Sequence, residues 1–111
     1  MNYGNWWADF PDPDNYMYTY FHSSQSKSMS SNYNNPKVDE LLNEARTTTD
    51  PAKRAAIYQQ LEQIIVYDDV AVVPLFHLKD YLAVQPDVHG VIMHPTGVNS
   101  YREVYKGNQG Q

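Results

Sequence analysis

Two stretches of the chain space their apolar residues as amphipathic helices do. In "NNPKVDELLNEAR" the apolar positions recur at i, i+3, i+4 and i+7, namely Val38, Leu41, Leu42 and Ala45. Asn35 is a favourable N-cap, and Pro36 follows at the first helical position, where its missing N–H costs nothing. "TTTDPAKRAAIYQQLEQIIVYDD" repeats this design with Asp50 and Pro51. It continues into a wider apolar stripe of Ile57, Tyr58, Leu61, Ile64 and Ile65. Because the threonines between the two stretches disfavour helix, residues 35–69 are predicted to form a helical hairpin.

The pattern changes to one typical of strands after residue 69. "VAVVPLFHLKDYLAVQ" is rich in β-branched and aromatic residues, which predicts a long or broken strand at residues 72–84. "VIM" and "SYREVYK" are candidates for two further short strands within residues 70–106, and residues 107–111 form a polar tail. Helices and strands together predict an α/β, or mixed α+β, chain.

The first 34 residues contain short predicted elements. Residues 2–9 favour a strand that must end at the prolines of "PDPDN". Asp12 or Asp14 can then cap a short helix, which completes a segment over residues 1–22. Residues 23–34 are rich in Ser and Asn with almost nothing to bury, so a solvated loop is expected, with a gating loop as the alternative.

Composition excludes several classes of function. The formal charge is −5 and no basic run is present, so nucleic acid is not an expected partner. The absence of cysteine removes disulfides, thiolate metal clusters and thiol nucleophiles. No stretch approaches the length of an apolar membrane span, and "MNYGNWWADF" lacks the features of a signal peptide.

Candidate catalytic and metal-binding residues are few. Asp9, Asp12 and Asp14 could act as an acid–base pair or as metal ligands, but their spacing does not match a calcium loop, and helix capping explains Asp12 and Asp14. The remaining candidates are histidines at spacings that fit no strong metal motif: His77, His89 and His94. Phosphate-loop and hydrolase motifs are missing as well. The sequence therefore predicts no enzyme, no catalytic residue, no metal and no cofactor.

The stretch "GNWWADFPDPDNY" concentrates aromatic area, acids and rigid turns in thirteen residues, which favours a binding element. Together with "N-P-K-V-D-E-L-L" and "A-x-V-P-L-F", its pattern "W-x-x-D-x-x-D-P-D-N" resembles the extracytoplasmic solute-binding proteins of family 5. These proteins include the oligopeptide, dipeptide and nickel binders of bacterial ABC importers. The resemblance runs from about Asn5 to Val91 and is to their C-terminal part, so the chain is interpreted as a C-terminal fragment.

This resemblance implies a ligand site at residues 5–9. The acid of the W-x-x-D motif, here Asp9, would pair with the α-amino group of a bound peptide. Residues from Asn5 to Ala8 would form the strand that hydrogen-bonds the peptide backbone. Trp6 or Trp7 would flatten one wall, and the other would belong to the core, because neighbouring side chains of a strand point to opposite faces. Two alternatives are that Asp9 caps a turn while both indoles are core residues, and that the solute is a nickel chelate or a sugar.

The same resemblance implies the C-terminal portion of a two-lobed periplasmic-binding-protein fold of type II. The expected partners are a peptide or other small solute, the N-terminal part of the parent protein and, through that parent, the membrane subunits of an ABC importer. The expected location of the parent is extracytoplasmic, in the periplasm or as a cell-surface lipoprotein. Because residues 72–84 would pack on missing elements, exposed apolar surface and self-association are predicted. A small Tyr/Trp-rich protein-interaction domain is the alternative from another functional class.

Overall fold

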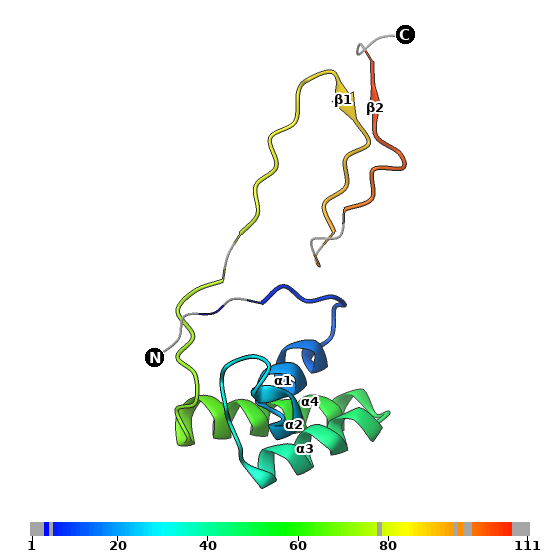
Figure 1. Cartoon of the computed structure of the whole chain (residues 1–111). Coiled ribbons are helices and arrows are strands. Elements are labelled where there is room, and N and C mark those ends of the chain that lie inside the picture. The colour runs from blue at the N-terminus through cyan, green and yellow to red at the C-terminus, as the bar shows by residue number, and fades with distance from the viewer. Residues whose placement is uncertain (1–3, 5, 78, 95, 97–98, 108–111) are drawn as a thin grey trace. The chain divides into compact units, whose positions relative to one another are not determined.

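The computed structural model describes residues 4, 6–77, 79–94, 96 and 99–107, and the chain divides into two compact units. The first unit spans Met1–Leu75 and contains all the helices found among these residues (Figure 1). The second spans Phe76–Gln111 and contains the two strands assigned there. The fold is therefore mixed, with much helix and little strand, and no helix of the described residues is long and apolar enough to cross a membrane.

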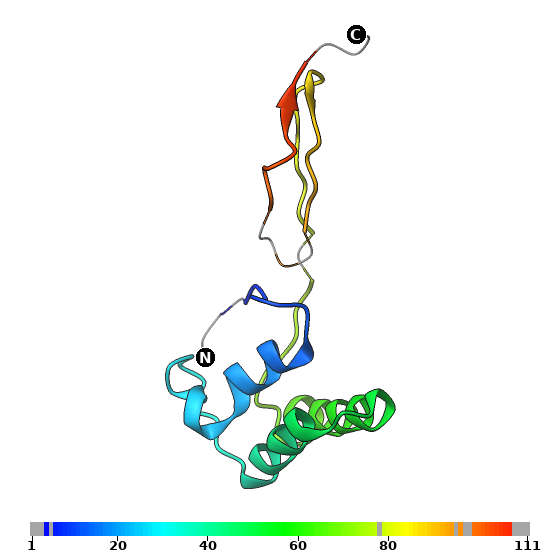
Figure 2. The same ribbon diagram turned by 90° about the vertical axis from the view of Figure 1, so that its right-hand side faces the viewer.

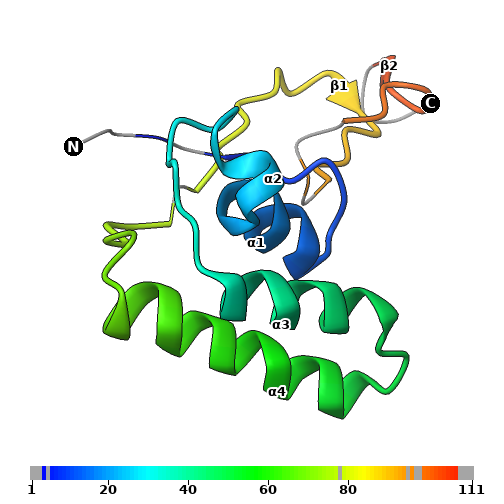
Figure 3. The same cartoon turned by 60° about the horizontal axis from the view of Figure 1, so that its bottom comes forward.

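The predicted helical hairpin is present and begins at both predicted caps. Helix α3 (Pro36–Thr47) has Asn35 as its N-cap, whose side chain accepts from the backbone N–H of Lys37. Helix α4 (Pro51–Glu62) starts at Asp50, whose carboxylate accepts from the next two free N–H groups. The two helices lie side by side and run in opposite directions (Figure 3). A π-helical turn, η1 (Gln63–Asp68), continues α4 to the predicted end of the hairpin.

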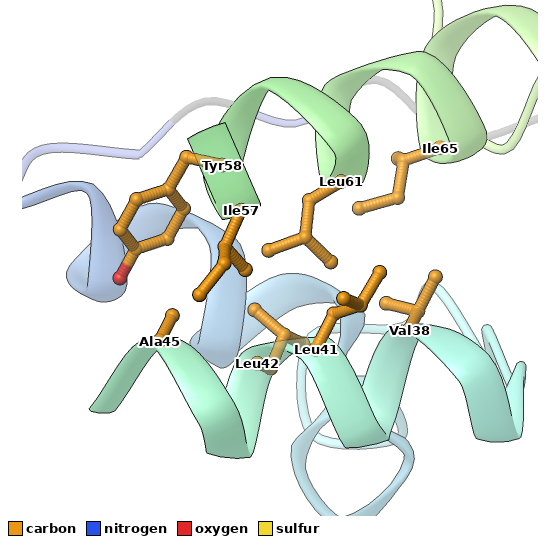
Figure 4. Close-up of a cluster of buried hydrophobic side chains, with 8 residues drawn as sticks. All are labelled: Val38, Leu41, Leu42, Ala45, Ile57, Tyr58, Leu61 and Ile65. Atoms are coloured by element: carbon orange, nitrogen blue, oxygen red, sulfur yellow. The ribbon is translucent and has the colours of Figure 1, made fainter. Parts of the chain in front are cut away.

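The core of the first unit lies between α3 and α4 (Figure 4). Side chains of the two helices point toward one another, and the buried cluster consists of Val38, Leu41, Leu42, Ala45, Ile57, Tyr58, Leu61 and Ile65. All eight belong to the two apolar stripes that the helical spacing predicted, and of the predicted residues only Ile64 is partly rather than fully buried. Leu42 and Leu61 are fully buried, so each contributes roughly 1.5–3 kcal/mol by leaving water.

A third helix, α1 (Pro13–Phe21), covers this hairpin. Asp12 is its N-cap, and Met17 and Phe21, one turn apart, pack against the core cluster as their spacing predicts. The Ser/Asn-rich segment departs from the predicted loop, because residues Ser23–Ser26 form a short helix, α2. Its stability comes from tertiary hydrogen bonds: Asp39 accepts from the backbone and hydroxyl of Ser23.

Ser26 shows why a polar sequence can still be ordered here. Its side chain is buried, and its hydroxyl donates to the carbonyl oxygen of Tyr33 at 2.7 Å. The buried hydroxyl therefore has the hydrogen-bond partner that a polar group needs when it leaves water. The prediction of a simple solvated loop over residues 23–34 is wrong for its first four residues.

The predicted strand at residues 72–84 is not formed among the described residues. The described residues of this segment belong to no strand, and their large apolar side chains are exposed, among them Leu75 at 68% and Tyr81 at 88%. A strand requires a neighbour to hydrogen-bond its backbone, and the described residues provide none here. The predicted exposed apolar surface is thus confirmed, whereas self-association stays a prediction.

The second unit holds a short antiparallel ribbon. Strand β1 (Val88–His89) pairs with β2 (Tyr105–Lys106), and the two lie side by side (Figure 2). An isolated bridge joins Ile92 to Ser100. The predicted strands at "VIM" and "SYREVYK" are therefore reduced to this bridge and to two residues. Pairing is limited to one narrow ribbon, and such a two-stranded ribbon has little stability of its own.

Candidate functional site

The predicted ligand site is a segment without regular secondary structure. Asn5 lies outside the described residues, while Trp6, Trp7 and Ala8 belong to no strand. The predicted strand over residues 5–8 is therefore wrong for the described part of the segment. Within the described residues, the backbone of residues 6–8 makes no hydrogen bond to another backbone group. Among the described residues, the segment therefore has no neighbouring strand with which its backbone could form the hydrogen bonds of a sheet.

Asn15, in the first turns of α1, holds this segment in place. Its side-chain oxygen accepts from the indole Nε1–H of Trp6 at 2.7 Å and from the backbone N–H of Asp9 at 3.1 Å. Its amide nitrogen lies 3.5 Å from Oδ2 of Asp9. Asn15 is only 6% exposed. Because both groups facing its oxygen are obligate donors, the orientation of the amide is fixed.

The two tryptophans lie in different environments. Trp6 is partly buried and packs edge-on against Tyr20, with ring centroids 5.8 Å apart. Trp7 is 46% exposed, while Ala8 beside it is buried. Trp7 is thus available to a ligand, and Trp6 joins the segment to α1.

The three acids of the motif have separate roles in the structure. Asp12 receives two hydrogen bonds from Arg54, at 2.7 and 2.8 Å, and caps α1. The bonds from Arg54 hold the pKa of the Asp12 carboxyl below its ordinary value, against an opposing effect of burial. Asp14 receives two bonds from Arg46, both at 2.8 Å. These pairs tie α1 to α4 and α3.

Asp9 differs from both neighbouring acids. It is exposed, and in the part of the chain that the structure describes no Lys, Arg or His lies within salt-bridge distance of its carboxylate. It caps none of the described helices, since the N-cap of α1 is Asp12. Asp9 therefore presents an accessible negative charge at a position that Asn15 fixes through its backbone.

The alternative of a metal or catalytic cluster gains no support from this arrangement. The carboxylates of Asp12 and Asp14 are occupied by arginines, and no cluster of three or more potential ligands is found among the described residues. His89 contacts the carbonyl oxygen of Gly107, and His94 contacts the hydroxyl of Thr96. His77 is exposed.

Sequence analysis missed Asn15, Arg46 and Arg54. Asn15 is part of the motif "D-P-D-N" but was not interpreted, although a buried asparagine beside a helix start commonly bonds nearby backbone. The arginines are separated from their acids by 32 and 42 residues. No local pattern could have indicated these pairs.

Comparison with known proteins finds relatives that match most of this chain. No family model and no solved structure matches the chain. The chain is 40% identical over 95 residues to the probable D,D-dipeptide-binding periplasmic protein DdpA of Escherichia coli (strain K12), covering 83% of this chain and 18% of that protein. It is 32% identical over 100 residues to the oligopeptide-binding protein OppA of Bacillus subtilis (strain 168), covering 90% of this chain and 18% of that protein.

A third relative carries another solute in its name. Heme-binding protein A of Haemophilus influenzae is 33% identical over 97 residues, covering 86% of this chain and 18% of its own length. The chain thus spans about a fifth of the length of these curated relatives. The similarity extends over most of the chain and includes peptide-binding proteins from several bacteria. Over most of its length the chain is therefore similar to family 5 extracytoplasmic solute-binding proteins, as expected for a fragment of such a protein.

Proposed function

We propose that this chain forms one side of the ligand site of a solute-binding protein that delivers peptides to an ABC importer. In this proposal Asp9 pairs with the α-ammonium group of the peptide. The observation that carries it is the contrast among the three acids: Asp12 and Asp14 each hold an arginine, whereas Asp9 has no cationic partner among the described residues. A peptide N-terminus supplies the missing charge.

The chemistry of the segment supports this role. A carboxylate forms a shorter and stronger bond to an ammonium group than a neutral acceptor does. The backbone groups of residues 6–8 make no hydrogen bond to another backbone group of the described residues. They could bond the main chain of an extended peptide, a mode of binding that is independent of peptide side chains. The exposed face of Trp7 offers apolar area next to this charge.

The remaining parts of the proposal follow from the family. The full-length protein would have two lobes, act outside the cytoplasm and bind the membrane subunits of its importer. The names of relatives include periplasmic peptide-binding proteins, and solute binding rather than catalysis is the function they share. The helices and the segment at residues 72–84 would pack partly against the rest of that protein.

A second candidate is a non-peptide solute, because one relative is named for heme. An anionic or metal-chelate solute would not require a free carboxylate at Asp9. The two candidates therefore differ in the ligand chemistry that Asp9 should favour.

Titration calorimetry of the full-length protein that carries this sequence tests the proposal. Di- to pentapeptides with a free amino terminus should bind, and the same peptides with an acetylated amino terminus should bind at least about 30-fold more weakly, since losing a buried charge pair costs on the order of 2–5 kcal/mol. Heme and a nickel chelate serve as comparison ligands. Binding of either comparison ligand without any binding of free-amino peptides would contradict the proposal.

A further inference from the structure

We infer that Asn15 is the positioning residue of the ligand site, which sets the place of both Trp6 and Asp9. The inference rests on the proposed function of Asp9 and adds a residue that does not itself touch the ligand. Its basis is the three contacts of one buried amide: 2.7 Å to the Trp6 indole nitrogen, 3.1 Å to the Asp9 backbone nitrogen and 3.5 Å to the Asp9 carboxylate.

The burial of Asn15 gives these contacts their importance. The residue is 6% exposed, so an unpaired amide here would not regain its hydrogen bonds from water. The two bonds to its oxygen fix residues that lie nine and six positions earlier in the chain. Since residues 6–8 have no strand partner in the described part of the chain, Asn15 supplies the order that a ladder would otherwise give.

The start of the helix that carries Asn15 is itself anchored. Asn15 belongs to α1, where Asp12 and Asp14 are bound to Arg54 and Arg46 on the hairpin. The position of the Asp9 charge is thereby linked to the helical core through a chain of hydrogen bonds. Small errors in the placement of a charged group matter, because productive geometry must be held within about 0.5 Å.

The electrostatic part of the role concerns the amide nitrogen. The Asn15 NH₂ group faces Oδ2 of Asp9 and is a neutral donor. It orients the carboxylate and leaves its negative charge in place, whereas an arginine would neutralise that charge. Asp9 therefore stays available to a cationic ligand while its backbone and carboxylate are held from one side.

Exchange of the indole protons with solvent tests the positioning role in the 111-residue chain without ligand. The chain has two tryptophans, and Trp7→Phe assigns their two indole signals in an NMR spectrum. The Trp6 indole proton should exchange at least about 10-fold more slowly than that of Trp7, since a hydrogen bond worth roughly 1.4 kcal/mol protects it by that factor. Asn15→Leu should abolish this protection of the Trp6 indole proton, whereas Asn15→Asp should retain it because the oxygen acceptor is kept. Asn43→Ala, at an exposed site of α3, is the control and should leave the protection unchanged.

Peptide binding by the full-length protein provides the second measurement. Asn15→Leu should weaken binding of a free-amino peptide at least about 10-fold, while Asn43→Ala should leave it unchanged. Unchanged indole exchange in Asn15→Leu, or unchanged peptide affinity, would overturn the inference. If wild-type protein binds no peptide, the proposed function fails, and the indole exchange alone then decides whether Asn15 positions this segment.

Discussion

The joint between Asp12 and Arg54 gives a quantitative test of how α1 is fixed to the hairpin. Asp12 both caps α1 and accepts two bonds from Arg54. Arg54 also donates to the carbonyl oxygen of Ala45, near the end of α3, at 3.0 Å. One guanidinium therefore joins three helices.

The expected energies follow from exposure and geometry. The side chains of Arg54 and Asp12 are 27% and 33% exposed, so solvent screens the pair and its worth is about 1 kcal/mol, the upper end for surface pairs. The cap contributes about 1 kcal/mol more. Asp12→Ala should therefore destabilise the chain by about 2 kcal/mol and Asp12→Asn, which keeps a capping oxygen, by about 1 kcal/mol. Arg54→Met should cost about 2 kcal/mol because the bond to Ala45 is lost as well.

A double-mutant cycle isolates the pair. Urea unfolding of the 111-residue chain, followed by far-ultraviolet circular dichroism, gives the free energy of unfolding for wild type, Asp12→Ala, Arg54→Met and the double variant. The coupling should be about 1 kcal/mol. The control cycle uses Lys37 and Glu40, a 3.1 Å pair whose side chains are 62% and 71% exposed. Its coupling energy should be only a few tenths of a kcal/mol, on the order of other exposed helix pairs. If the coupling energy between Asp12 and Arg54 is no larger than that of the control pair, this ion pair does not fix α1 to the hairpin.

The pH dependence of this coupling has a defined sign. Arg54 lowers the pKa of Asp12 in the folded chain relative to its ordinary value of 3.8. Stability from the pair is therefore fully present above that ordinary value and is lost as pH falls through the lower, folded pKa. The coupling should thus be unchanged between pH 7 and pH 5 and should disappear in stronger acid.

Two further pairs of substitutions test the two units separately. In the first unit, Leu42 is fully buried and Leu75 is 68% exposed. Leu42→Ala should therefore lower the free energy of unfolding by roughly 2–5 kcal/mol, whereas Leu75→Ala should change it by less than about 0.5 kcal/mol. Equal effects of the two substitutions would contradict the assigned core. In the second unit, Gly90 has φ +75 and a Cβ there would lie 2.0 Å from the carbonyl oxygen of Glu103. Gly90→Ala should therefore remove the cross-strand NMR contacts between β1 and β2. Gly107→Ala is the control and should retain these contacts, because the added Cβ would meet only a side chain, at 3.8 Å. Contacts retained in both variants would show that the ribbon does not need a glycine at position 90.

The helices could be predicted because their signals are local. Asn35 and Asp50 each stand directly before a proline, and the apolar spacing of α3 and α4 identifies their buried faces without knowledge of the rest of the fold. The short helix α2 could not be predicted in this way. Its order depends on Asp39 and on the carbonyl oxygen of Tyr33, which lie later in the chain.

The strand at residues 72–84 is the opposite case to α2, because it is predicted by the sequence but is not formed among the described residues. Its β-branched and aromatic composition expresses a preference for a pleated, half-buried surface, but composition does not supply the neighbouring strand. The same limit applies to the candidate site. The motif predicts Asp9 and the tryptophans as site residues, but it does not predict that Asn15 contacts both Trp6 and Asp9, because these contacts depend on the fold.

The most direct test of the central claim is the coupling between Asp9 and the amino group of a bound peptide. Calorimetry of the full-length protein would compare wild type and Asp9→Asn, each with a free-amino peptide and with its N-acetylated form. Asp9→Asn should cost on the order of 2–5 kcal/mol for the free-amino peptide, and acetylation should then cost the variant little more. If the penalties for the substitution and for acetylation simply add, the two groups do not interact, and the proposed role of Asp9 is wrong.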